Sequence, residues 1–100
     1  MYISKEKKEK ISEQILAYLY SANPKPLFTF HIAKELARDE EFIKKLLIDL
    51  KKKEFVIEIT KNPKGKEYSR RSRWKLSEKV YILYKQKQGQ NQSNSDIHTN

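Results

Sequence analysis

Residues 61–75 hold the strongest chemical signal in this sequence. Seven of these residues are basic and one, Glu67, is acidic, so the segment has a formal charge of 7 − 1 = +6 out of +9 for the whole chain. The basic residues are Lys61, Lys64, Lys66, Arg70, Arg71, Arg73 and Lys75. Such a density of cations attracts polyanions, with nucleic acid as the first candidate and an acidic membrane surface as the second. The imbalance of charge favours a contact with nucleic acid over a merely solvated surface.

The segment has the pattern of a β-hairpin. Residues 55–60 read FVIEIT, which is typical of a strand, and residues 62–65 read NPKG, which is typical of a turn. In a second strand, alternation places Tyr68, Arg70, Ser72, Trp74 and Leu76 on one face and Ser69, Arg71, Arg73 and Lys75 on the other. Because Trp74 shares its face with Leu76, we expect it to anchor the hairpin in the core rather than to stack on a base.

Three helical patterns precede this hairpin. The first spans residues 4–20, where Ile11, Ile15 and Leu19 share a face, and it ends at the prolines of residues 23–26. Leu27-Phe28 then predicts a short strand. A second helix is expected over residues 30–37, with Thr29 as its N-cap, and a third over residues 40–52, with Asp39 as its N-cap. The last two must meet through a tight turn.

The C-terminal quarter divides into an apolar helix and a polar tail. Ser77 is expected to cap a helix from Glu78 to about Gln88, whose first half is apolar on most of its surface. From Gly89 the chain reads GQNQSNSDIHTN, which predicts a disordered tail over residues 89–100. The folded domain is therefore expected to comprise residues 1–88.

Several function classes lack candidate residues. The chain has no cysteine, and its two histidines, His31 and His98, lie far apart without an acidic cluster, so we expect no metal site and no cofactor. No Gly-rich phosphate loop or catalytic triad order is present, which predicts a protein that is not an enzyme. The charged N-terminus and the short apolar run at 80–84 predict a cytoplasmic protein without a membrane span.

The order of these elements, mainly α with a small β-hairpin (α+β), resembles the winged helix-turn-helix superfamily. FTFHIAKELARDEEFIKKLLIDLKKKEFVIEI is similar to its helix-turn-helix and first wing strand, and RWKLSEKV is similar to its second wing strand and closing helix. MarR-like and PadR-like regulators and small archaeal or viral winged-helix proteins have this arrangement. The likeness covers roughly residues 5–88. Ala37 and Glu54 stand where such proteins usually have glycine.

The resemblance implies sequence-specific or semi-specific binding of double-stranded DNA, in a transcriptional regulator. Residues 40–52 would be the recognition helix in the major groove, and residues 61–73 the wing on the backbone or minor groove. The expected DNA contacts are Thr29, His31, Lys34, Lys44, Lys45, Ile48, Lys61, Lys64, Lys66, Arg70, Arg71 and Arg73.

Apolar surface on the first and last helices predicts a homodimer. One small core cannot easily cover the run at 80–84 together with Leu16 and Tyr20, whereas a symmetric partner would pair Ile82 with Leu16 or Tyr20. The alternative is that this run packs within its own subunit. A second function also stays open: a winged-helix module for protein interaction in a transcription or replication assembly, whose basic hairpin docks on an acidic protein surface.

Overall fold

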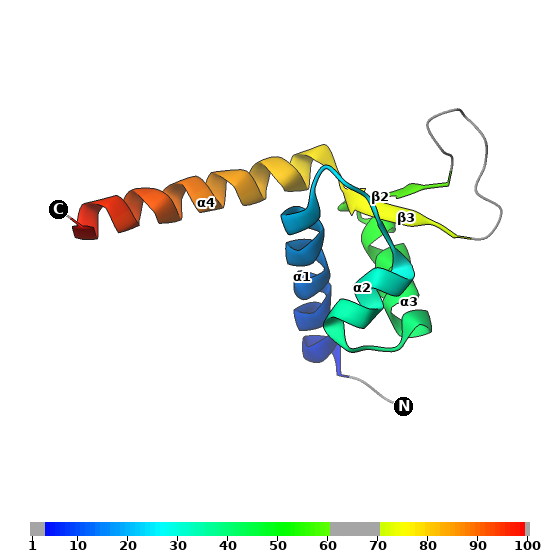
Figure 1. Cartoon of the computed structure of the whole chain (residues 1–100). Coiled ribbons are helices and arrows are strands. Elements are labelled where there is room, and N and C mark those ends of the chain that lie inside the picture. Colours follow the sequence, from blue (N-terminus) through cyan, green and yellow to red (C-terminus); the bar gives the residue numbers. More distant parts are fainter. Residues whose placement is uncertain (1–3, 61–70, 100) are drawn as a thin grey trace.

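The computed structural model describes residues 4–60 and 71–99 and contains four helices and three strands within them. In chain order these are α1 (Lys5–Ala22), β1 (Leu27–Phe28), α2 (Thr29–Leu36), α3 (Glu40–Lys52), β2 (Val56–Ile59), β3 (Arg73–Leu76) and α4 (Glu78–Thr99). Helices α1, α2 and α3 pack against one another and against a small sheet (Figure 1). The predicted class, mainly α with a small β-hairpin, is confirmed.

The helix starts follow from capping side chains, with one exception. Asp39 Oδ2 accepts a hydrogen bond of 3.0 Å from the Phe42 N–H, and Ser77 Oγ accepts one of 3.5 Å from the Val80 N–H, as predicted. The prediction that Thr29 caps α2 was wrong. Thr29 is the first residue of α2, and Phe28 holds the cap position without a side-chain hydrogen bond. The hydroxyl of Thr29 is instead bonded to another side chain, described below.

Two helices end in a left-handed residue that is not glycine. Ala37, after α2, has φ 54°, and Glu54, near the end of α3, has φ 64°. At each site two backbone hydrogen bonds close the helix end. The bond that spans more residues runs from the Arg38 N–H to Ala33 O at the end of α2 and from the Phe55 N–H to Leu50 O at the end of α3, each at 2.9 Å. These are the two positions at which glycine was expected from the resemblance. Ala37 and Glu54 therefore adopt the left-handed backbone conformation that glycine favours.

The three strands form an antiparallel sheet in the order β1-β3-β2. Leu27 pairs with Trp74, and Val56 pairs with Leu76. Trp74 and Leu76 are buried, whereas Arg73 and Lys75, on the opposite face, are only half-buried. This confirms the predicted alternation for the described part of the second strand, and it confirms Trp74 as a core anchor.

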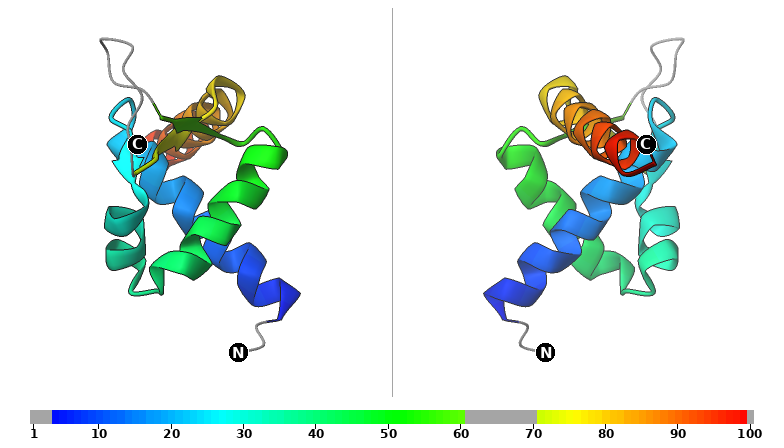
Figure 2. Two further views of the ribbon diagram at one scale, coloured as in Figure 1. Left: turned by 90° about the vertical axis from the view of Figure 1, so that its right-hand side faces the viewer. Right: turned by 90° about the vertical axis from the view of Figure 1, so that its left-hand side faces the viewer.

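One core holds these elements together. The side chains with the least exposure come from α1, α2, α3 and β3, and α1 crosses α3 in the views of Figure 2. The fully buried members are Ile11, Ile15, Leu19, Ile32, Ile43, Leu47, Trp74 and Leu76. At about 25 cal/mol per Å² of apolar area, each such side chain stabilises the fold by roughly 1.5–3 kcal/mol. The core leaves one face of α3 and the edge of the sheet in solvent.

The last helix is longer than expected. The predicted end near Gln88 was wrong, because α4 continues to Thr99, where the composition had predicted a disordered tail. Residues 89–99 contain no proline, so the backbone hydrogen bonds of the helix are not interrupted there. The C-terminal part of α4 extends away from the other elements (Figure 1). Among the residues that the structure describes, none of the helices is both long and apolar enough to span a bilayer.

Candidate nucleic-acid interface

Helix α3 presents a polar and partly apolar face to solvent. Ile43, Leu47 and Leu50 are buried, so the opposite side of the helix is left outside. That side exposes Lys44, Lys45 and Ile48, the three residues predicted to read DNA from α3. Ile48 has 38% of its surface exposed, as its predicted role requires. The face thus combines two cations with one apolar side chain.

A small hollow of about 50 Å³ joins α3 to α2 and to the start of β3. It is lined by Phe28, Thr29, Phe30, Glu40, Lys44, Arg71 and Ser72. Three predicted DNA contacts, Thr29, Lys44 and Arg71, therefore line one hollow, although Lys44 and Arg71 are 27 positions apart in the sequence, by the difference 71 − 44. The hollow connects the predicted recognition helix with the base of the predicted wing.

Phe30 is a candidate that the sequence reasoning missed. It lies in the first turn of α2, lines this hollow, and has 46% of its surface exposed. Its ring stands edge-on to the ring of His31, with 5.7 Å between the centroids. An exposed aromatic beside Lys44 and Arg71 suits an apolar contact with DNA, for example with a thymine methyl or a sugar. The signal was present in the sequence, since helical spacing turns Ile32, Ala33 and Leu36 toward the core and leaves Phe30 outside this face.

The other predicted contacts of α2 lie beside a different hollow. His31 and Lys34 are exposed and line it together with Tyr18, Lys25 and Glu35. The ring of His31 also lies 5.7 Å from the ring of Phe28, which lines the first hollow. Lys34 is therefore not brought to the place where Lys44 and Arg71 meet.

Thr29 is placed differently from the other predicted contacts. Only 8% of its surface is exposed, and its hydroxyl accepts a 2.8 Å hydrogen bond from the indole N–H of Trp74. This bond satisfies the donor of a completely buried tryptophan, which would otherwise be costly. The side chain of Thr29 thus belongs to the core beneath the hollow.

The basic hairpin is described only in part. Arg71 is exposed, whereas Arg73 is half-buried with its guanidinium 5.8 Å from the centroid of the Phe28 ring, a cation–π geometry. Four predicted contacts, Lys61, Lys64, Lys66 and Arg70, lie outside the described residues. Within the described part, Arg71 is therefore the more accessible of the two arginines.

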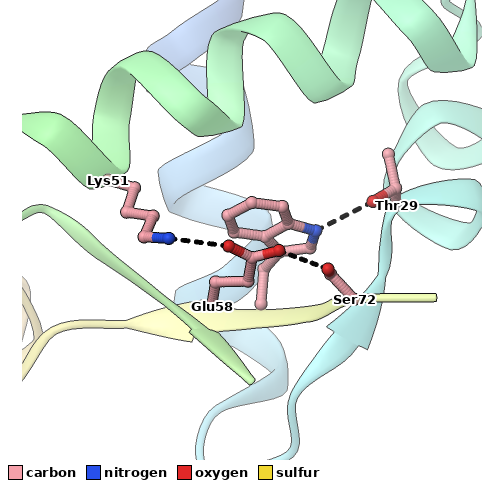
Figure 3. A network of polar contacts seen from close by, with 5 residues as sticks. Thr29, Lys51, Glu58 and Ser72 are labelled. Atoms are coloured by element: carbon pink, nitrogen blue, oxygen red, sulfur yellow. Dashed lines mark hydrogen bonds and ion pairs between the residues drawn. The ribbon is translucent and has the colours of Figure 1, made fainter. Parts of the chain in front are cut away.

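A polar network ties α3 to the hairpin. Glu58 of β2 accepts a 2.8 Å hydrogen bond from Lys51 Nζ of α3 and another from the hydroxyl of Ser72, just before β3 (Figure 3). The bond from Lys51, the bond from Ser72 and the nearby charges of Lys51 and Lys44 lower the pKa of Glu58, although partial burial acts to raise it. Glu58 therefore stays ionised at neutral pH.

The formal charge of α3 and its flanks is balanced. Between residues 39 and 54, five lysines are matched by five acids, so the sum is 5 − 5 = 0. The lysines are Lys44, Lys45, Lys51, Lys52 and Lys53, and the acids are Asp39, Glu40, Glu41, Asp49 and Glu54.

In the described part of the chain, no group of three or more His, Cys, Asp or Glu side chains is arranged to hold a metal ion.

The predicted dimer surface is partly covered by the chain itself. The ring of Tyr20 lies 5.5 Å from that of Tyr81 and 5.4 Å from that of Tyr84, between centroids. Val80 is buried as well. Ile82 and Leu83, by contrast, are 43% and 60% exposed. The run at 80–84 thus packs within its own subunit through three of its residues and leaves two apolar side chains in solvent.

Comparison with solved structures places the fold. The S. aureus MepR–DNA complex aligns with a TM-score of 0.64 and 19% sequence identity over 94% of this chain and 80% of that chain. Lactococcus lactis ZitR, in a mutant apo form, aligns with a TM-score of 0.64 and 19% sequence identity over 94% of this chain and 66% of that chain. The adhesin competence repressor AdcR from Streptococcus pyogenes aligns with a TM-score of 0.61 and 17% sequence identity over 89% of this chain and 60% of that chain.

The fold of this chain agrees with that of these neighbours, and the predicted winged helix-turn-helix fold is confirmed. This chain is shorter than they are: it spans 51% of the length of a second MepR structure, a mutant that is 24% identical with a TM-score of 0.61. No protein-family model matches the sequence, and no curated protein is significantly similar to it. The similarity therefore concerns the fold.

Proposed function

We propose that this protein is a cytoplasmic, non-enzymatic transcriptional regulator that binds double-stranded DNA through residues 1–88. Helix α3 enters the major groove, and the hairpin of residues 61–73 lies along the backbone or the minor groove. The observation that carries this proposal is the small hollow in which Lys44 of α3 and Arg71 of the hairpin meet beside the exposed Phe30. A fold neighbour, MepR, has been solved in complex with DNA, which supports the same use of the fold here.

The two halves of the interface have different tasks. The hairpin segment 61–75 has a formal charge of +6, whereas residues 39–54 are neutral. Affinity that does not depend on sequence therefore comes mainly from the hairpin, through neutralisation of phosphates and release of counterions. Preference for a sequence comes from Lys45 and Ile48 of α3, since a lysine can donate to guanine and an isoleucine can contact a thymine methyl.

Two copies of the chain act together in this proposal. Leu83 of α4 lines an apolar hollow of about 400 Å³ together with Leu16 and Phe55, and Ile82 is exposed on the same helix. A two-fold partner would bury these side chains. It would also set two hairpins on one face of the DNA, with half-sites about one helical turn, roughly 34 Å, apart or a multiple of it.

The test is duplex-DNA binding measured at several salt concentrations. The wild-type protein is expected to show a steep fall of affinity with salt, and replacement of Arg70, Arg71 and Arg73 together by Ala should weaken binding to every sequence. The salt slope should flatten by up to roughly 0.9 for each phosphate that the variant no longer neutralises. An unchanged slope in the triple variant would refute the role of the hairpin.

Sequence preference is tested separately with Lys45→Ala. This variant should lose discrimination at one base position of a selected site, worth about 1–3 kcal/mol at most. A uniform loss across all sequences would instead make Lys45 a phosphate contact. If heparin competes as well as any duplex, binding reports only attraction to polyanions, and the alternative function of a protein-interaction module stays open.

A further inference from the structure

In the part of the hairpin that the structure describes, the side chain of Glu58 on β2 bonds both to Lys51 of α3 and to Ser72, which lies next to β3. One carboxylate oxygen accepts from Lys51 Nζ at 2.8 Å, and the other accepts from the Ser72 hydroxyl. The side chain of Glu58 is 21% exposed and that of Lys51 is 52% exposed, so the carboxylate is the more enclosed partner. An acid is thus held at the base of a hairpin whose other charges are mostly positive.

The position of Glu58 explains how the contact is made. Glu58 pairs with Trp74 across the strands, so its side chain shares the inner face of the sheet with the buried indole. Figure 3 shows Lys51 reaching down from α3 to one side of the carboxylate and Ser72 lying on its other side. Ser72 is followed directly by β3, and it is preceded by the exposed Arg71.

We propose that Glu58 is a positioning residue for DNA binding: it fixes the base of the hairpin relative to the recognition helix, so that Arg71 and Lys44 approach the duplex in one geometry. Lys51 and Ser72 are the two points that it holds. This inference rests on the proposed function, because it concerns how the two DNA-contacting parts are kept in register.

Replacement of Glu58 separates positioning from electrostatics, because the negative charge of Glu58 by itself opposes DNA binding. Replacement by glutamine raises the formal charge of the chain from +9 to +10, by the sum 9 + 1, and electrostatics alone then predicts tighter binding. Loss of positioning predicts the opposite sign. A glutamine amide cannot form the ion pair with Lys51, and its one carbonyl oxygen cannot replace both acceptors.

The experiment compares Glu58→Gln with Glu54→Gln in the full chain. Glu54 is an exposed acid at the start of the same connection from α3 to β2, so its replacement changes the charge equally without touching the network. The probe is a mixed-sequence DNA duplex of about 30 base pairs, three helical turns. Glu58→Gln is expected to bind roughly threefold to tenfold more weakly than wild type, as fits the net worth of one typical hydrogen bond, whereas Glu54→Gln binds equally or more tightly.

A second measurement, in a variant that lacks Arg71, distinguishes loss of positioning from a general loss of stability. In an Arg71→Ala background, Glu58→Gln should cost much less affinity than in the wild type, because the side chain that it positions is absent. Binding is measured at a temperature at which all four proteins are folded by circular dichroism. Tighter or unchanged binding by Glu58→Gln, or an equal loss in both backgrounds, would overturn the proposal.

Amide hydrogen exchange separates this inference from the proposed function. Without DNA, Glu58→Gln should speed exchange at Arg71, Ser72 and Arg73 while leaving Ile15 and Leu19 in α1 unchanged. A wild-type protein that binds no duplex would refute the proposed function. Exchange at residues 71–73 that equals that of wild type would refute the positioning role, whatever the DNA result.

Discussion

The indole N–H of Trp74 donates a 2.8 Å hydrogen bond to the hydroxyl of Thr29, which lies 45 positions earlier in the chain. The bond joins the second hairpin strand to the first turn of α2, inside the core. We predict that Thr29→Val destabilises the fold by about 1–3 kcal/mol, because a buried indole N–H then has no acceptor. Chemical denaturation measures this loss. Thr29→Ser keeps the hydroxyl and should lose much less.

The same pair of variants tests the DNA role that was predicted for Thr29 from the sequence. With its hydroxyl bonded to Trp74, the residue is expected to act through stability alone. Thr29→Val should therefore bind duplex DNA as the wild type does once the measured fraction of folded protein is taken into account. A folded Thr29→Val protein with reduced affinity and a flatter salt slope would restore Thr29 as a direct contact.

Glycine should stabilise the protein at two positions. Ala37 and Glu54 have φ values of 54° and 64°, a region that costs a non-glycine residue about 1–2 kcal/mol. Glycine removes this cost but gives the unfolded chain more freedom, so we expect a net gain of up to about 1 kcal/mol from Ala37→Gly or Glu54→Gly. Ala17→Gly, in the interior of α1, is the control and should destabilise by roughly 0.5–1 kcal/mol. Equal losses in all three variants would argue against strain at the two turns.

Phe30 should contribute to DNA affinity without contributing to its salt dependence. An apolar contact with a base or sugar releases no counterions, so Phe30→Ala is expected to weaken binding while the slope of log affinity against log salt stays unchanged. Lys44→Ala, from the same hollow, should flatten the slope by up to roughly 0.9. Ile57→Ala is a matched control, because Ile57 is 43% exposed against 46% for Phe30 and does not line that hollow. Wild-type affinity of Phe30→Ala would remove this residue from the interface.

The exposed apolar pair on α4 gives a test of the dimer. Ile82→Glu should convert a dimer to a monomer in sedimentation experiments at micromolar concentration, because it places a charge in the expected interface. DNA affinity should fall in step. Gln88→Glu adds the same charge and keeps an acceptor for the Tyr20 hydroxyl, which donates to Gln88 Oε1 at 3.0 Å, and it should leave the dimer intact. A wild-type monomer that Ile82→Glu does not change would exclude the dimer.

The network at the base of the hairpin should make stability depend on pH in acid. The bonds from Lys51 and Ser72 lower the pKa of Glu58 in the folded state. A carboxyl with a lowered pKa stabilises the fold above its unfolded pKa, and this contribution is lost as the pH falls through its folded pKa. The stability difference between wild type and Glu58→Gln should therefore be constant near neutral pH and shrink below about pH 4, the usual range of a free carboxyl. A difference that does not vary with pH would mean that the ion pair contributes nothing.

The sequence by itself determined the elements of this protein and their order. Apolar spacing in Ile11, Ile15 and Leu19 and in Ile43, Leu47 and Leu50 defines two helix faces, because a helix repeats every 3.6 residues whatever lies beyond it. Asp39 and Ser77 begin helices through bonds that reach only three residues ahead. The positive φ values at Ala37 and Glu54 agree with the resemblance, since winged-helix proteins usually have glycine at these two positions. All of these interactions are local along the chain.

Only the tertiary structure decided which side chains pair with one another across separate elements. Thr29 looked like a helix cap, but Trp74, 45 positions away, takes its hydroxyl. Glu58 looked like one more acid in a strand, but Lys51 and Ser72 enclose it from two directions. Tyr20 looked free for a partner chain, but Tyr81 and Tyr84 pack against it. Each of these pairings joins separate elements, and its energy depends on how the helices and the sheet meet in space, which no pattern within one element can specify.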